Sequence, residues 1–464
     1  MRRIFVASLF VGFTGAWAAA CGSDEAPIAD PPDASADGSP TPPSEGGPSP
    51  NDASGSSDAT TDPDVSDAGD AGSFTYNDFT TANWSAFDVT STLPGSAGHW
   101  GGAFDGRYVY FVPSHNSTTW NGIVTRYDTQ ATFNTAGAWA SYDTAAVYPA
   151  VAGYYGAVFD GRYMYFVPPA SGPAGIVTRY DTQAAFNDAA SWMTFDLTSV
   201  NAGAKGFIGG TFDGRYVYFA PYYNGTYDGI VARLDTQGTF NQAASWSTFD
   251  VKGVNNAAVA FYGAIFDGRY VYFIPDTNGV SGTIARYDTQ AAFGTAGSWS
   301  TFDITTVNAN AKGFNTGAFD GRYLYLCPGA SGDKSVVARY DTQAAFGTAA
   351  SWSTFDATTV NANAKGFFGA SFDGRYITFV PHLHSIALRY DTQASFTTAG
   401  SWGALDLTPV GTKPAGFQGS VFDGQYLYLV PYWTGGSYSG NVFRFDAKSP
   451  KGMPNLPAFH GSFF

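Results

Sequence analysis

The chain has 464 residues, with 38 acidic and 23 basic side chains and a formal net charge of −15. This balance excludes a protein that binds nucleic acid through a broad basic surface. Only two cysteines are present, so a fold held together by many disulfides is excluded as well.

The first 20 residues have the layout of an export signal. Arg2 and Arg3 provide a positive start, residues 4–13 are apolar, and residues 18–20 are three alanines that precede Cys21. The apolar run is too short to remain as a membrane-spanning helix, and no later stretch of about eighteen apolar residues follows it. We therefore predict that residues 1–20 are a signal peptide and that the chain is exported.

The residues around Cys21 resemble the lipobox of bacterial lipoproteins. The match is Ala19-Ala20-Cys21-Gly22, with Ala18 in place of the usual leucine. The resemblance implies acylation of the Cys21 thiol. Gly22 resembles the residue that follows the cysteine in lipoproteins that are sent to the outer membrane or cell surface. The alternative is an ordinary signal peptide followed by an unmodified cysteine.

A spacer follows the cysteine. Residues 22–72 contain twelve acidic residues, no lysine or arginine and no aromatic residue. Such a segment has too little apolar surface to offset chain entropy, and its charges repel each other. We predict that residues 21–73 are a disordered tether.

The folded part is only mildly acidic. Twelve of the 38 acidic residues lie in the tether and two of the 23 basic residues lie in the signal peptide, which leaves 26 acidic and 21 basic residues in the rest of the chain.

Three motifs recur seven times each after Phe74, and such repetition is sought before local structure. Phe-Asp-Gly-Arg-Tyr has its aspartate at Asp105, Asp160, Asp213, Asp267, Asp320, Asp373 and, with glutamine for arginine, Asp423. Arg-Tyr-Asp-Thr-Gln, with variants, has its aspartate at Asp128, Asp181, Asp235, Asp288, Asp341, Asp391 and Asp446. The third motif begins at Trp84, Trp139, Trp192, Trp246, Trp299, Trp352 and Trp402 and ends in an aspartate four residues later.

Each repeat unit predicts four strands. Asp267-Gly268 is a strong hairpin signal between two apolar runs, because the turn needs positive φ where glycine is unstrained. Both faces of the second run are apolar, which is typical of a strand covered on both sides. In the fourth unit the four predicted strands are 263–266, 269–274, 283–287 and 299–304.

Seven units of four strands predict an all-β, seven-bladed β-propeller. The chain begins with a fourth strand at Trp84 and ends with a third strand at Arg444. Seven complete blades therefore require the N-terminal strand to finish the last blade. We place the propeller at residues 74–450 and a C-terminal tail at 451–464, and we expect a monomer.

The repeat resembles the kelch family. The order of an inner strand, an Asp-Gly turn, a Tyr-rich strand, a Tyr-Asp pair and a later tryptophan matches 263–268, 270–272, Tyr287-Asp288 and Trp299, and the likeness covers about 84–446. The double glycine of that family is replaced by proline after each second strand, as at Pro275. The resemblance implies a divergent kelch-like propeller. Because such propellers serve many functions, it implies little about activity.

Most charged residues belong to the motifs. Twenty-one of the 26 aspartates and all thirteen arginines of the folded part do, and we expect them to make turn hydrogen bonds and ion pairs. No arginine is left for a sialidase-like site. Only Asp228, Asp276 and Asp333, in successive blades, are available for hydrolysis by two carboxylates. We therefore predict no enzymatic activity, with a carbohydrate-active enzyme as the alternative.

Cofactor and metal sites are not predicted. Copper oxidases of the galactose oxidase type resemble this fold but need two histidines, two tyrosines and a cysteine linked to tyrosine. Cys327 occupies a strand position held elsewhere by small apolar residues and is expected to be buried. His382 and His384 are a close pair, but two ligands without a third are a weak metal signal.

The loops after strands two and four differ between blades, so the face that carries them is the predicted ligand-binding face. Aromatic rings among Asn, Gly and His suit a glycan or a protein partner. The alternatives are that the rings only cap the blade edges, or that the propeller is a scaffold in an envelope complex. The predicted ligand-binding residues are Trp100, His115, Trp120, Tyr155, Tyr222, Tyr223, Tyr227, Tyr262, Phe368, His382, His384, Tyr432, Trp433 and Tyr438.

Overall fold

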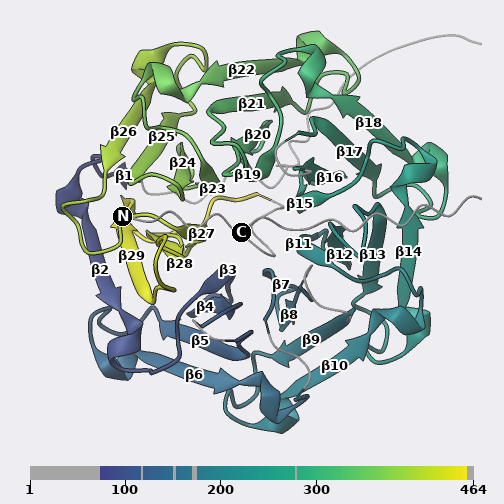
Figure 1. Ribbon diagram of the computed structural model, residues 1–464, viewed down its shortest axis with the longest axis horizontal. Helices are drawn as coiled ribbons and strands as arrows, with labels where there is room; N and C mark the ends of the chain where they lie inside the picture. Colours follow the sequence, from purple (N-terminus) through teal and green to yellow (C-terminus); the bar gives the residue numbers. More distant parts are fainter. Residues whose placement is uncertain (1–73, 117–118, 150–152, 170–174, 277–279, 457–464) are drawn as a thin grey trace, which may run out of the picture. The chain divides into compact units, whose positions relative to one another are not determined.

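The computed structural model describes residues 74–456 except 117–118, 150–152, 170–174 and 277–279. The predicted signal peptide, Cys21 and the tether lie outside the described residues. Within them, seven four-stranded antiparallel sheets surround a common centre as the blades of a propeller (Figure 1). No helix of the described part is long and apolar enough to cross a membrane.

Each blade has its first strand at the centre and its fourth at the rim (Figure 1). Blades 1 to 3 are β3 (His99–Phe104), β4 (Tyr108–Pro113), β5 (Ile123–Asp128) and β6 (Trp139–Asp143); β7 (Ala157–Phe159), β8 (Tyr163–Phe166), β9 (Ile176–Asp181) and β10 (Trp192–Asp196); and β11 (Phe207–Phe212), β12 (Tyr216–Pro221), β13 (Ile230–Asp235) and β14 (Trp246–Asp250). Blades 4 to 6 are β15 (Phe261–Phe266), β16 (Tyr270–Pro275), β17 (Thr283–Asp288) and β18 (Trp299–Asp303); β19 (Phe314–Phe319), β20 (Tyr323–Pro328), β21 (Val336–Asp341) and β22 (Trp352–Asp356); and β23 (Phe367–Phe372), β24 (Tyr376–Pro381), β25 (Ile386–Asp391) and β26 (Trp402–Asp406).

The seventh blade confirms the predicted closure of the ring. Its strands are β27 (Phe417–Phe422), β28 (Tyr426–Pro431), β29 (Asn441–Asp446) and, from the other end of the chain, β2 (Trp84–Asp88). Trp84 lies opposite Phe445, and the two rings stack with centroids 4.9 Å apart. A further two-stranded sheet pairs β1 (Thr75–Tyr76) with β30 (Lys448–Ser449). Both ends of the propeller are therefore held in the last blade.

Short 3-10 helices flank the fourth strands. They are η1 (Thr81–Asn83), η2 (Val89–Ser91), η3 (Ala136–Ala138), η4 (Thr144–Ala146), η5 (Ala189–Ser191), η6 (Leu197–Ser199), η7 (Ala243–Ser245), η8 (Val251–Gly253), η9 (Ala296–Ser298), η10 (Ile304–Thr306), η11 (Ala349–Ser351), η12 (Ala357–Thr359) and η13 (Ala399–Ser401). The predicted fourth strand 299–304 ends one residue early, at Asp303. The Asp303 carboxylate accepts a hydrogen bond from the Thr305 backbone N–H and so caps η10. The aspartate of the tryptophan motif thus ends the strand.

The second strand of each blade packs against both neighbouring blades, as its two apolar faces predicted. Tyr272 and Ile274 of blade 4 belong to a cluster with Leu324 of blade 5. Val271 and Phe273, on the other face of β16, belong to a cluster with residues of blade 3. The core is thus a ring of interfaces between blades, which explains why neither face of the strand carries exposed polar residues.

The Asp-Gly turn is held by its own aspartate. Asp267 Oδ1 accepts the backbone N–H groups of Arg269 and Tyr270 at 2.8 and 2.6 Å, and Oδ2 accepts the Tyr272 hydroxyl at 2.7 Å. Gly268 adopts φ +104°, a value that an L side chain rarely takes. The repeated Asp-Gly and the second tyrosine are therefore parts of one local hydrogen-bonded unit.

The first motif arginine forms an ion pair within its own blade. Arg269 Nη2 lies 2.7 Å from Asp288 Oδ2, which joins the start of the second strand to the end of the third. Six blades contain this pair: Arg107–Asp128, Arg162–Asp181, Arg215–Asp235, Arg269–Asp288, Arg322–Asp341 and Arg375–Asp391. In the seventh, Gln425 donates to Asp446 at 3.3 Å instead.

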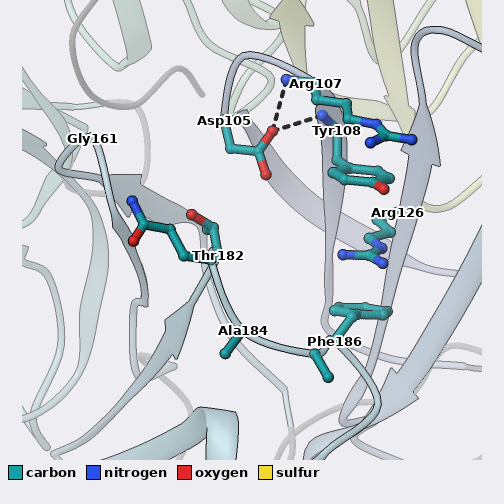
Figure 2. A pocket seen from close by; sticks show the side chains of 10 residues that line it. Asp105, Arg107, Tyr108, Arg126, Gly161, Thr182, Ala184 and Phe186 are labelled. Atoms are coloured by element: carbon teal, nitrogen blue, oxygen red, sulfur yellow. Dashed lines mark hydrogen bonds between the residues drawn. The ribbon is translucent and has the colours of Figure 1, made fainter.

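The second motif arginine connects neighbouring blades. Figure 2 shows Arg126 between the Tyr108 ring of blade 1 and the Phe186 ring of blade 2, with centroid distances of 4.0 and 4.1 Å. A guanidinium between two aromatic faces makes two cation–π contacts. The equivalent pairs across blade boundaries are Arg126–Phe186, Arg179–Phe240, Arg233–Phe293, Arg286–Phe346, Arg339–Phe396 and Arg444–Phe133. The Arg444–Phe133 contact is the one that joins blade 7 to blade 1.

Candidate functional site

Antiparallel order divides the loops between two faces of the propeller. The Asp-Gly turns and the loops after the third strands lie on one face, here called the uniform face. The loops after the second and fourth strands lie on the other, here called the variable face. A cavity of about 460 Å³ lies between blades 1 and 2 and is lined by motif residues, among them Asp105, Arg126 and Phe186 (Figure 2). Because Asp105 and Arg126 have equivalents in all seven blades and Phe186 in six, the variable face is the better place to look for a specific site.

Side chains from the first strands fill the centre of the variable face. Trp100 stacks on Tyr155 with centroids 4.1 Å apart and meets Phe368 of blade 6 edge-on at 5.4 Å. Contacts between such distant blades require the rings to lie across the central axis. We call the cluster the aromatic plug, and its members are Trp100, Tyr155, Ile208 and Phe368, with Tyr222, Tyr262 and Tyr432 packed against them. Three of the predicted ligand-binding residues, Trp100, Tyr155 and Phe368, are therefore buried.

Polar atoms lie beside the plug without a hydrogen-bond partner among the described residues. They are Trp100 Nε1, Asn315 Oδ1 and Gln418 Oε1. Asn315 and Gln418 hold the blade 5 and blade 7 positions equivalent to Trp100, and both are buried. Burial beside Asp276 and other tyrosines raises the pKa of Tyr262 well above its ordinary value. The plug therefore stays uncharged near neutral pH.

Three loops after second strands fold into short hairpins that carry aromatic side chains. We call them the aromatic hairpins; their described residues are 114–116 and 119–121 in blade 1, 222–228 in blade 3 and 432–439 in blade 7. Each is closed by a bridge, and the bridges are His115 with Trp120, Tyr223 with Tyr227 and Trp433 with Tyr438. Trp120, Tyr223 and Trp433 are 38%, 43% and 38% exposed. These predicted residues lie at the surface.

The hairpins of blades 7 and 1 join into one surface. Trp433 meets Tyr438 edge-on at 4.8 Å, and Tyr438 stacks on His115 of the next blade at 4.7 Å with an interplanar angle of 22°. His115 in turn meets Trp120 edge-on at 5.5 Å. We call this series of four rings the blade 7–1 platform. Trp120 also approaches Tyr155 at 6.0 Å, so the platform is continuous with the plug.

The blade 3 hairpin has a different environment. The Tyr222 hydroxyl donates to Asp276 Oδ2 of blade 4 at 3.5 Å, and the Tyr227 ring lies 5.8 Å from those of Tyr222 and Tyr223. Tyr222 also meets Tyr262 of the plug at 5.0 Å. The three tyrosines therefore form a second aromatic group, at which Tyr223 is the exposed member.

The three aspartates that were candidates for catalysis have separate partners. Asp228 accepts the Gly229 backbone N–H at 2.8 Å and lies 3.8 Å from Lys252 Nζ; burial raises its pKa to about 6. Asp276 is buried and accepts from Tyr222. Asp333, at φ +54°, lies 2.6 Å from Lys365 Nζ and 3.0 Å from His384 Nε2.

The two neighbouring histidines also point to different partners. His382 Nδ1 donates to the Phe417 carbonyl at 2.9 Å, and its ring lies 5.5 Å from that of Phe368. Burial lowers the pKa of His382. His384 donates to Asp333 instead. Within the described ranges, no group of three His, Cys, Asp or Glu residues is arranged to hold a metal ion.

The chain is a seven-bladed β-propeller. No protein-family model matches its sequence, and no curated protein matches it. Among solved structures it is similar to a streptogramin B lyase, with a TM-score of 0.54 and 13% identity over 80% of this chain and 100% of that one. It is also similar to an inactive virginiamycin B lyase from Staphylococcus aureus with quinupristin, with a TM-score of 0.52 and 13% identity over 78% and 98%. At this identity the likeness shows the fold alone.

Proposed function

We propose that this chain is an exported bacterial lipoprotein with a divergent kelch-like propeller that binds a glycan or protein partner through the variable face. The observation that carries the proposal is the gathering of exposed aromatic side chains on three bridged hairpins of that face. The uniform face, in contrast, repeats the same turn and the same ion pair in most blades. A face that differs between blades on a rigid scaffold is suited to recognition.

The point at which the described chain begins supports display of the variable face. The Phe74 ring lies 4.0 Å from Lys448 Nζ, and β30, which contains Lys448, is followed by Gly452. The Gly452 N–H donates to the carbonyl of Gly424, which belongs to an Asp-Gly turn. Phe74 is thus on the uniform face. The face opposite the first described residue is therefore the one that carries the aromatic hairpins, which is compatible with recognition by the variable face of a tethered propeller.

We also propose that the propeller binds without catalysing a reaction. Asp228, Asp276 and Asp333 were the carboxylates considered for hydrolysis, and they are engaged by a backbone N–H, a tyrosine hydroxyl and a lysine respectively. A pair of carboxylates that acts on a glycosidic bond needs both groups on one substrate. Three separate sets of contacts favour structural roles for these residues.

The proposal is tested by capture experiments with the full-length chain. The immobilised chain is exposed to an extract of its native envelope, and the soluble chain is applied to a glycan array. We expect at least one of the variants Tyr223→Ala and Trp433→Ala to lose binding, because each deletes an exposed ring from a different hairpin of the variable face. Met193→Ala is the matched control, since Met193 is 39% exposed on the outer strand β10. Binding that persists in both hairpin variants would show that another surface is used.

A further inference from the structure

We propose that the blade 7–1 platform binds a neutral oligosaccharide chain that extends from Trp433 to Trp120. This inference rests on the proposed function and names the ligand class for one part of the variable face. Its basis is the series of four rings, Trp433, Tyr438, His115 and Trp120, that crosses the boundary between two blades.

The shape of the platform suits a chain of sugar units. Exposed indoles lie at both ends, and Tyr438 and His115 lie half-buried between them. Each exposed indole presents a stiff apolar surface, and the C–H face of a pyranose ring packs on such a surface. Two indoles separated by intervening rings can contact separate sugar units of one extended chain. A single enclosed sugar would instead need a closed pocket.

The side chains around the rings favour a carbohydrate over a lipid or an apolar peptide. The described hairpin residues beside the rings include Asn116, Thr119, Thr434 and Ser437, which provide hydroxyl and amide groups. Residues 114–116, 119–121 and 432–439 contain no aliphatic side chain larger than that of threonine. A lipid or an amphipathic helix buries broad aliphatic area, whereas a sugar needs polar groups beside an aromatic face.

The charge of the platform favours a neutral ligand. The same described hairpin residues contain no Asp, Glu, Lys or Arg. A lysine contacts the blade 7 hairpin: Lys413 Nζ donates a hydrogen bond to Ser437 Oγ at 3.1 Å. An acidic polysaccharide is normally held by several cationic groups, because carboxylates and sulfates must be paired when they leave water. One lysine beside the rings does not supply them.

Backbone hydrogen bonds hold the described residues of both platform hairpins. Ser439 N–H donates to the Tyr432 carbonyl at 2.7 Å, and Thr434 N–H donates to the Ser437 carbonyl at 3.1 Å, which fixes the blade 7 hairpin. Asn121 N–H donates to the Ser114 carbonyl at 3.0 Å and closes the blade 1 hairpin. A surface already held by backbone hydrogen bonds has less conformational entropy to lose on binding, so weak stacking contacts can add up to measurable affinity.

The test is native affinity electrophoresis of the full-length chain in gels that contain one soluble polysaccharide each. The probes are a neutral β-glucan, a neutral mannan, a neutral α-glucan and acidic polygalacturonate. We expect at least one neutral polymer to retard the chain and polygalacturonate to leave its mobility unchanged. Trp433→Ala and Trp120→Ala should each weaken that binding roughly tenfold or more, in line with the loss of a central aromatic contact.

Two further variants separate the platform from the rest of the face. Trp433→Phe keeps an aromatic surface and should retain part of the affinity. Tyr223→Ala alters the blade 3 hairpin and should retain all of it. If no neutral polymer retards the chain, if only polygalacturonate does, or if both tryptophan variants bind like the original chain, the carbohydrate proposal is overturned. Loss of a captured protein partner in Trp433→Ala without any neutral glycan binding would leave the binding face intact and reject the sugar.

Discussion

Arg389 Nη2 donates to Asp373 Oδ2 at 3.0 Å, and the two side chains form a buried ion pair in blade 6. In the other blades the equivalent aspartate oxygen accepts a tyrosine hydroxyl, as Asp320 does from Tyr325. Blade 6 has Thr378 at the position of that tyrosine, so the oxygen is available to arginine.

The same arginine also holds the N-terminal segment. Arg389 Nη1 donates to the Asn77 carbonyl at 2.9 Å, and the guanidinium lies 3.6 Å from the Tyr376 ring. Tyr76 meets Tyr376 edge-on at 5.7 Å. Where the repeat lacks this tyrosine, blade 6 is thus contacted by β1 and the residue that follows it.

The first prediction concerns this ion pair. Asp373→Asn should destabilise the propeller by roughly 3–5 kcal/mol, because it leaves a buried arginine without its countercharge. The measurement is the free energy of unfolding from urea titration. Arg107→Gln is the control, since it breaks an exposed pair and imitates the natural glutamine of blade 7; its cost should be below about 1 kcal/mol. Equal losses in the two variants would contradict a special role for the buried pair.

The second prediction concerns the stacked arginines between blades. Arg286 lies 4.1 Å from the Tyr270 ring of its own blade and 4.3 Å from the Phe346 ring of the next. A double-mutant cycle of Arg286→Ala and Phe346→Ala should give a coupling free energy of about 0.5–2 kcal/mol. The coupling free energy is calculated from the unfolding free energies of the original chain, the two single variants and the double variant. Additive effects of the two substitutions would mean that the rings pack without a cation–π contribution.

The third prediction is a loss of stability in acid. A hydrogen bond from Arg269 holds the pKa of Asp288 below its ordinary value, and five other blades have the same pair. A carboxyl with a depressed folded pKa stabilises the fold above its unfolded pKa and loses this contribution as the pH falls through the folded pKa. The urea concentration at the unfolding midpoint should therefore decrease as the pH is lowered from about 5 to about 2.5. Added salt should weaken this dependence, because the arginines are about half exposed.

The fourth prediction has the opposite sign. Burial raises the pKa of Asp228 to about 6, so the ionised carboxylate opposes folding at higher pH. Asp228→Asn should stabilise the propeller by roughly 1–2 kcal/mol at pH 7 and change little at pH 3.5, where the original carboxyl is mostly protonated in both states. Thermal unfolding at the two pH values measures the difference. A destabilised variant at pH 7 would instead indicate that the charge is required, for example by Lys252.

The fifth prediction tests the plug as a structural element. Trp100 contacts Tyr155, Tyr262, Phe368 and Tyr432 and is 8% exposed. Trp100→Ala should cost roughly 3–5 kcal/mol because it removes a buried indole and leaves a cavity on the axis. Trp120→Ala, at a 38% exposed position, is the comparison and should cost far less. The unfolding free energies of the two variants decide whether the plug or the surface hairpin carries stability.

The order of the motifs predicted the strands because the residues of each motif make hydrogen bonds to neighbours in the sequence. Asp267 caps its own turn, Asp303 caps the helix after its own strand, and both do so with residues two or three positions away. Such contacts depend on short-range geometry and repeat wherever the motif repeats. The closure by β2 followed from counting strands, and the pairing of Trp84 with Phe445 confirms it.

The candidate site was predicted only as a set of positions. Trp100, Tyr155 and Phe368 were predicted to lie on the ligand-binding face, but their burial in one cluster depends on how far side chains from different blades reach across the axis. The stack of His115 on Tyr438 joins residues far apart in sequence, and it exists because closure places blade 7 beside blade 1. Each aromatic hairpin has an aromatic or histidine ring on both of its sides. This recurrence is the signal in the sequence from which the bridged hairpins could have been predicted.

Sequence alone was sufficient for the number of blades, the place where the ring closes and the division into a uniform and a variable face, because these follow from local motifs and their order. The structure was needed to separate buried rings such as Trp100 from exposed rings such as Trp433, and to find the platform shared by two blades. Burial and contact between blades depend on the summed packing of the whole ring. That packing is a property of the closed propeller and is not contained in any one repeat.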